Sequence, residues 1–184
     1  KNPAPMLERL PLIDEMGYPY YFEFTVTAYG REIERNVPEK SAVIDIFKRL
    51  SDKIGPGRVD WRFDPILINE RLSASWIAEQ YEILCGQLHE YTERCIISFV
   101  DEYSHTRNRN FLLNRNDMLE TARHIAAIAG QYRLPVFSCA EEINLGSLGI
   151  EHSACIDRKK IEGLIGAHIT AKKDPGQRSA CGCI

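Results

Sequence analysis

The chain has no long apolar run, no large excess of one charge and few cysteines for a protein held together by disulfides. Among its 184 residues, no stretch approaches the ~20 consecutive apolar residues that a membrane span requires. A net charge of -3 argues against a general nucleic-acid-binding surface, although it does not exclude a local basic pocket. We therefore expect a soluble protein with a small-molecule substrate and no membrane partner.

The cysteines are too sparse for a disulfide scaffold, since only six occur in the whole chain. Cys85, Cys95 and Cys139 lie inside apolar periodic stretches, where buried free thiols are common. This usage favours a reducing, cytoplasmic location.

The first residues, KNPAP, include no initiator methionine and no charged-then-apolar secretory pattern. We therefore expect part of a longer protein. Its length predicts one domain over residues 1–184, incomplete at both ends, with a tail over residues 167–184.

Four strand-type segments alternate with helix-type segments along the chain. The strand-type segments are YPYYFEFTVT, RVDWRFDPI, RCIISFV and LPVFSC. Between them, apolar residues recur every three or four positions, which predicts amphipathic helices. The two clearest stripes are Val43, Phe47, Leu50 and Ile54, and Ile77, Tyr81, Leu84 and Leu88. A further helix is expected over residues 5–16, and Gly17, Gly55 and Gly130 occupy positions that favour left-handed helix caps.

The strand spacing is regular. The strand centres Phe22, Trp61, Ile97 and Phe137 lie 39, 36 and 40 residues apart, which leaves room for a helical crossover between parallel strands. We predict an α/β fold, a parallel (β/α) barrel of the TIM type or part of one, without its first strand. A doubly wound open sheet has the same period and is the competing architecture.

Polar and apolar side chains alternate along the first two strands. Trp61 and Phe63 would face one side of the sheet, while Asp60, Arg62 and Asp64 would face the other. In a parallel sheet, a polar face indicates a wet or ligand-filled space. An antiparallel sheet with one solvent-facing side is the alternative explanation.

Polar side chains also follow the carboxyl ends of the strands, where (β/α) folds gather their functional groups. The candidates are Thr25 and Thr27; Arg62 and Asp64; Ser98 and Asp101; and Ser138, Cys139 and Glu141. Arg62 and Asp64 are the most specific pair, because Pro65 is expected to end the strand just after them. Together they could hold a carboxylate or phosphate, and an internal ion pair is the alternative.

Two further segments contain reactive residue types. The run DEYSHTRNRN, residues 101–110, could bind an anion or form a solvated loop. His152 and Cys155 precede an amphipathic stretch and could be metal ligands. Cys155 could instead be a thiol with a lowered pKa. The alternative is a packed cysteine beside a surface histidine. His89 and His124 have no acidic or thiol partner at ligand spacing.

Cys181 and Cys183 stand two residues apart near the end of the sequence. In an extended segment both side chains would share one side, and Gly182 would let the backbone approach a bulky inorganic group. Two thiolates do not complete a zinc or iron–sulfur site, so more cysteines would be needed. A tail with incidental cysteines is the alternative.

Several stretches together resemble a bacterial family of uncharacterised proteins, domain of unknown function eighteen forty-eight. They are KNPAP, YPYYFEFTVTAYGREIERNVP, RLSDKIGPGRVDWRFDPI, YTERCIISFVDEY, ACIDRKKIEGLIG and KKDPGQRSACGCI. The resemblance runs in register from Lys1 to Cys183. It implies a barrel whose C-terminal region carries cysteines similar to the iron–sulfur cluster motif of radical S-adenosylmethionine enzymes.

The resemblance also implies a set of roles. Cys181 and Cys183 match the first cysteines of that region and are the metal candidates. A 4Fe–4S cluster and S-adenosylmethionine are implied for the longer protein, and neither is expected on this part alone. The resemblance implies that the rest of that C-terminal cysteine region is missing here and lies beyond Ile184. Placement near strand ends, rather than the resemblance, makes Arg62, Asp64 and Asp101 the catalytic candidates, and Thr25, Ser98 and Glu141 the cofactor-binding candidates.

Two other functions remain open on the sequence alone. One is a barrel hydrolase or lyase that binds a divalent metal through Asp64, Asp101, Glu141 or His152. The other is a non-catalytic module in which the cysteines bind structural zinc.

Overall fold

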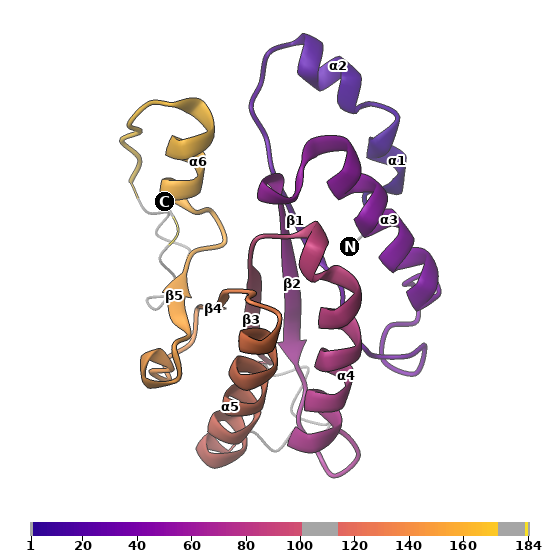
Figure 1. The fold of residues 1–184 in the computed structure, drawn as a ribbon, viewed down its shortest axis with the longest axis vertical. Coiled ribbons are helices and arrows are strands. Elements are labelled where there is room, and N and C mark those ends of the chain that lie inside the picture. The colour runs from indigo at the N-terminus through magenta and orange to yellow at the C-terminus, as the bar shows by residue number, and fades with distance from the viewer. Residues whose placement is uncertain (1, 101–113, 173–182, 184) are drawn as a thin grey trace.

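The protein folds around one open sheet of five parallel strands. The structure is a computed structural model that describes residues 2–100, 114–172 and 183. The strands lie side by side in chain order, β1-β2-β3-β4-β5 (Figure 1). They are β1 (Phe22–Thr25), β2 (Val59–Ile66), β3 (Cys95–Phe99), β4 (Val136–Cys139) and β5 (Glu151–Ser153). All four strand pairs are parallel, so the predicted α/β fold is confirmed and the antiparallel alternative is wrong.

The strand order bears on the two competing architectures. A doubly wound sheet reverses its strand order at a switch point, and the five strands show no reversal. The sheet is not closed, because β1 and β5 form its two edges. A closed TIM barrel is therefore not shown, and a partial barrel remains a proposal.

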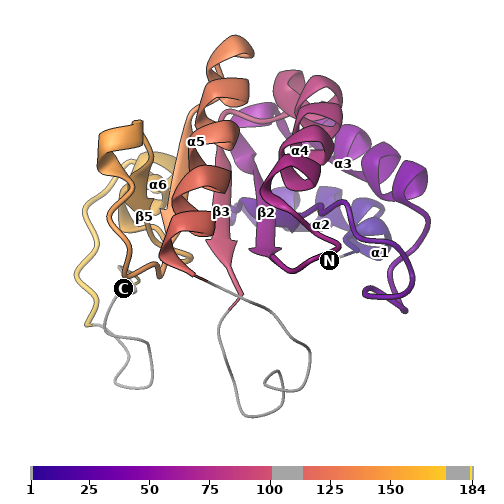
Figure 2. The same ribbon diagram turned by 90° about the horizontal axis from the view of Figure 1, so that it is seen from below.

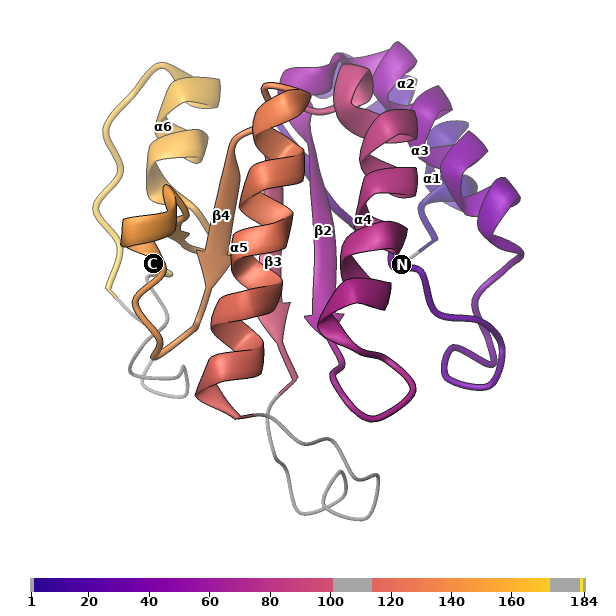
Figure 3. The ribbon, with the colours of Figure 1, turned by 60° about the horizontal axis from the view of Figure 1, so that its bottom comes forward.

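Three long helices cover one face of this sheet (Figures 2 and 3). They are α3 (Lys40–Ile54), α4 (Ala74–Leu88) and α5 (Arg115–Gln131). The two predicted apolar stripes are buried on α3 and α4. From the sheet, Trp61 stacks on Tyr81 with ring centroids 5.0 Å apart, and Phe63 meets the same ring edge-on at 5.2 Å. Because side chains alternate along β2, Arg62 and Asp64 project from the opposite side, which we call the polar face.

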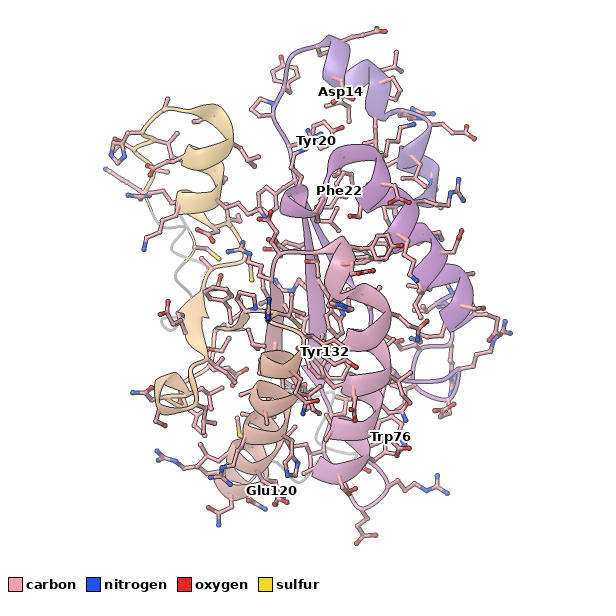
Figure 4. The ribbon with its side chains drawn as sticks, in the orientation of Figure 1. Asp14, Tyr20, Phe22, Trp76, Glu120 and Tyr132 are labelled. Carbon is pink, nitrogen blue, oxygen red and sulfur yellow. The ribbon has the colours of Figure 1, made fainter. Side chains whose placement is uncertain are left out.

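Aromatic contacts fasten both ends of α4 (Figure 4). Trp76, in its first turn, stacks on Tyr29 with ring centroids 6.2 Å apart. His89, just after its last turn, meets the ring of Tyr132 at 4.8 Å. These contacts therefore join α4 to the loop after β1 at one end and to the end of α5 at the other.

The helix expected over residues 5–16 is two helices, α1 (Ala4–Leu7) and α2 (Leu10–Glu15), which lie beside α3 in Figure 1. Pro11 explains the break, since a proline inside a helix has no N–H to donate and its ring clashes with the carbonyl four residues earlier, here that of Leu7. Gly17 follows α2 with φ of 72°, as its predicted capping position requires.

Two other predictions are wrong in detail. Pro65 does not end β2, which runs on to Ile66, and the pairing with β3 shifts register between Phe63 and Ile66. That shift accommodates a residue with no N–H to donate. Gly130 lies inside α5 rather than capping it, and Arg133 takes a positive φ of 54° beyond the helix.

The last elements lie at the β5 edge. The strand β5 has three residues and no apolar alternation, which explains why its sequence did not predict it. Asp157 caps the helix α6 (Arg158–Ile165), because its Oδ1 accepts from the Lys160 amide at 3.3 Å. Short 3₁₀ turns occur at Pro56–Arg58, His89–Tyr91 and Gly146–Leu148. Within the described ranges, no helix is long and apolar enough to cross a membrane.

Candidate thiol site on the polar face

Arg62 lies at the centre of the polar face and joins two carboxylates. Its Nε and Nη2 donate to Asp64 Oδ2 at 3.0 and 2.6 Å, and its Nη1 donates to Glu23 Oε2 at 2.7 Å. Burial lowers the pKa of Arg62, but the hydrogen bonds and charge of Asp64 outweigh burial and raise it overall. The guanidinium is therefore a fixed positive charge. The predicted pair exists, and it has the form of the internal ion pair that was the alternative explanation.

The register of the first two strands brings Thr25 into the same cluster. Thr25 pairs with Arg62 across the β1–β2 ladder, and its hydroxyl donates to Asp64 Oδ1 at 3.4 Å. Three of the predicted site residues thus meet at one place, near the carboxyl ends of β1 and β2. Their proposed roles toward a cofactor or substrate remain predictions.

Two thiols stand beside this charge cluster. Cys139 is the last residue of β4, and Cys155 lies two residues beyond β5. Their Sγ atoms are 2.8 Å apart, and both cysteines are free. Arg62 Nη1 lies 3.3 Å from Cys155 Sγ. The β4–β5 ladder pairs Cys139 with Ser153, which explains how residues 16 positions apart come together.

The two thiols differ in ionisation. The hydrogen bond from Cys139, and then Arg62, outweigh burial and lower the pKa of Cys155 to about 5. The same hydrogen bond, together with burial, raises the pKa of Cys139. At neutral pH the pair is therefore one thiolate that accepts a hydrogen bond from one thiol.

A third cysteine lies next to this pair. Cys183 is buried, with 5% of its surface exposed, and its Sγ accepts from the Ile156 amide at 3.3 Å. A hydrogen bond from Cys183 also contributes to the low pKa of Cys155. Cys183 therefore reaches the thiol pair, whereas Cys181 lies outside the described residues.

A second charge network holds the segment that carries Cys155. Asp60 is fully buried and pairs with Lys160 of α6 and with Arg94, whose Nη2 lies 2.7 Å from Asp60 Oδ2. The Nη1 of Arg94 donates to Asp157 Oδ2 at 2.6 Å. These pairs fix the turn between β5 and α6, and with it the position of the Cys155 thiol.

A cavity of about 760 Å³ opens beside this turn. Ser153, Asp157, Lys160 and Cys183 are part of its wall. The Oγ of Ser153 is buried and has no hydrogen-bond partner among the described residues. The cavity therefore places a space of small-molecule size, with several polar and charged side chains in its wall, beside the thiol site.

Two other predicted residues lie near the carboxyl ends of β3 and β4. Glu141 Oε1 accepts from the Phe99 amide at 2.7 Å, so this carboxylate fixes the end of β3. Ser98 lies on β3, two residues beyond Ile96, the register partner of Arg62, and so shares the polar face. Asp101 lies outside the described residues.

The described residues do not form a metal site as they stand. Nowhere in residues 2–100, 114–172 and 183 are three or more His, Cys, Asp or Glu side chains arranged to hold a metal ion. Two thiolates that share a tetrahedral zinc ion, each about 2.3 Å from it, would lie roughly 3.8 Å apart. The sulfurs of Cys139 and Cys155 are closer than that.

The family model of the Domain of unknown function (DUF1848) matches residues 1–184. The chain belongs to this family. The resemblance found in the sequence is thereby confirmed, and no curated protein matches the chain. The description of DUF1848 names no activity, so chemistry has to be argued from the site.

In this DUF1848 chain, the sequence points to Cys139 and Cys155 separately but does not predict that they form a pair. The missing information was β5, which sets the two residues side by side. The sequence alone does not single out Glu23, because its ion pair with Arg62 depends on the register between β1 and β2. A strand assigned to residues 151–153 would have been the signal for the thiol pair.

Proposed function

We propose that this chain is the barrel-like portion of an iron–sulfur enzyme of the radical S-adenosylmethionine type, acting on a small molecule. The observation that supports this most is the meeting of Cys139, Cys155 and Cys183 on a polar sheet face, beside fixed charges and a cavity. Thiolates are the ligands of iron–sulfur clusters, and a cavity of about 760 Å³ beside charged side chains suits the binding of a small molecule.

The fit of a cluster is incomplete on the described residues. A cubane cluster takes three or four separated thiolates, whereas Cys139 and Cys155 are in contact with each other and Cys183 accepts from a backbone amide. We therefore place the cluster at the edge of the site, next to Cys181 and Cys183, and derive no reaction step through it. A bound cluster would supply one-electron reduction of S-adenosylmethionine.

The chain's own residues would form the wall of the reaction space. Arg62 acts as a positioning residue, because its donors are used by Glu23, Asp64 and Cys155. Asp64 and Thr25 lie nearer the carboxyl ends of their strands and are the groups proposed to face a substrate or cofactor hydroxyl.

Metal content tests the proposal. The native full-length protein, purified anaerobically, is expected to contain stoichiometric iron and acid-labile sulfide and to give an iron–sulfur EPR signal after reduction. A double Cys181→Ser, Cys183→Ser variant should lose most of the iron. Cys85→Ser is the matched control, because this buried thiol lies on α4, away from the polar face, and the variant should keep its iron. Stoichiometric zinc without sulfide would contradict the proposal and favour a structural zinc module.

A further inference from the structure

We propose that Cys139 and Cys155 form a redox-active dithiol that undergoes exchange with low-molecular-weight disulfides. Nothing in the family description or the proposed cluster assigns this chemistry, and it does not depend on a bound metal. The proposal rests on two free sulfurs 2.8 Å apart, with a guanidinium 3.3 Å from one of them.

The geometry allows the two cysteines to bond without rearrangement of the sheet. A disulfide has a sulfur–sulfur distance of about 2.05 Å, so the two Sγ atoms need to approach by less than about 1 Å. The backbone is already in place, because β4 and β5 are paired and Cys139 is the partner of Ser153. The remaining approach is between two side chains on segments that the sheet already holds together.

The surroundings distinguish the two sulfurs chemically. The guanidinium of Arg62 lies 3.3 Å from Cys155 Sγ, where it stabilises negative charge, and Cys139 Sγ is within hydrogen-bond distance of the same sulfur. The carboxylate of Glu23 in the same cluster is already paired with Arg62. A thiol that donates to a neighbouring thiolate is the arrangement of reactive dithiols, in which one cysteine attacks and the other resolves.

The exchange would take place in two balanced steps. The Cys155 thiolate attacks one sulfur of a disulfide RS–SR; a bond forms between Cys155 Sγ and that sulfur, the RS–SR bond breaks, and RS⁻ leaves. The Cys139 thiol then gives its proton to the departed thiolate and attacks Cys155 Sγ, which forms the Cys139–Cys155 disulfide and releases the second RS⁻. The protein loses two electrons, and the small disulfide gains them as two thiol equivalents.

Oxidation would also change the charge cluster. Cys155 would no longer carry a negative charge, and Arg62 would keep only Glu23 and Asp64 as charged partners. The redox state of the pair would therefore change the balance of charge around Arg62, at the centre of the polar face.

The test uses the full-length native protein, reduced and then equilibrated in buffers of reduced and oxidised glutathione. Digestion at glutamate without reduction can cleave at Glu141, Glu142 and Glu151, all of which lie between the two cysteines. We expect the Cys139 and Cys155 fragments to remain joined in oxidising buffer and to separate after reduction. The Cys139→Ser variant should instead hold one glutathione on Cys155, because the resolving thiol is absent.

The controls separate this inference from the proposed function and from misfolding. Cys85→Ser should behave as the wild type, and circular dichroism of each variant checks that the sheet still forms. Iron measured on the same samples reports the cluster independently, so a joined pair without iron supports the dithiol alone. If Cys139 and Cys155 stay reduced in oxidised glutathione, or if Cys155 joins Cys183 instead, the proposal is overturned.

Discussion

The pKa values of Cys85 and Cys95 on one face of the sheet and of Cys155 on the other are shifted in opposite directions. On the helix-covered face, Cys85 and Cys95 are fully buried, and burial raises the pKa of Cys85 to about 12 and also raises that of Cys95. On the polar face, Cys155 has a pKa lowered to about 5, although burial opposes ionisation there too. Burial opposes ionisation on both faces, so what differs is the neighbours. A guanidinium and a thiol donor make one cysteine an anion, while apolar packing keeps the others as inert thiols.

Of the changes that test this comparison, the removal of Arg62 should have the largest effect on stability. Arg62→Met leaves Glu23, Asp64 and Cys155 without their shared cation, and breaking a largely buried pair costs about 3 kcal/mol of unfolding free energy. The measurement is urea denaturation. Arg49→Met is the matched control, because its pair with Asp45 is exposed on α3 and should cost less than about 0.5 kcal/mol. Equal losses in the two variants would mean that the polar-face cluster has no special role in stability.

The pH dependence of alkylation should distinguish the cysteines on the two faces. Cys155 is surrounded by Arg62, Cys139, Cys183 and Glu23, and its lowered pKa keeps it a thiolate at pH 6. Its reaction with iodoacetamide should therefore be nearly constant from pH 8 to pH 6 and fall about tenfold per unit below pH 5. Mass spectrometry of short reactions gives the rate at each cysteine. Cys85 should stay unmodified in the folded protein at every pH.

How far the sequence alone predicts this molecule can be seen from its strands and thiols. Alternation along FEFT and VDWRFDPI correctly assigns Trp61 to the apolar face and Arg62 to the polar face, because a pleated strand has a period of two. The thiol pair could not be predicted, because it depends on a three-residue strand with no periodic signal. Sheet closure could not be predicted either, since the same βα spacing suits open and closed sheets.

Loss of the negative charge of Asp157 should have a moderate, acid-sensitive effect on stability. Burial opposes ionisation of Asp157, but hydrogen bonds from Arg94 and the Lys160 amide lower its pKa overall. A lowered pKa contributes stability that is complete above the unfolded-state pKa and is lost as the pH falls through the folded-state pKa. Asp157→Asn keeps a capping oxygen but removes the negative charge paired with Arg94, so it should cost about 1 kcal/mol at pH 7, and the difference from the wild type should disappear in strong acid. Thermal unfolding from pH 7 to pH 2 measures this, with the exposed Asp52→Asn on α3 as the control.

The smallest expected effect on stability comes from Cys139, and it tests whether the thiol donor or Arg62 makes Cys155 an anion. The hydrogen bond from Cys139 is the largest cause of the low pKa of Cys155. If it contributes about 1.4 kcal/mol to the thiolate, Cys139→Ala should raise that pKa by about one unit and slow alkylation at pH 5 roughly fivefold. Cys139→Ser keeps a hydroxyl donor at the same place and should retain most of the rate. An unchanged rate in Cys139→Ala would mean that Arg62 alone stabilises the Cys155 thiolate. The cysteines on the two faces would then differ because of one neighbouring cation, not because of a paired thiol.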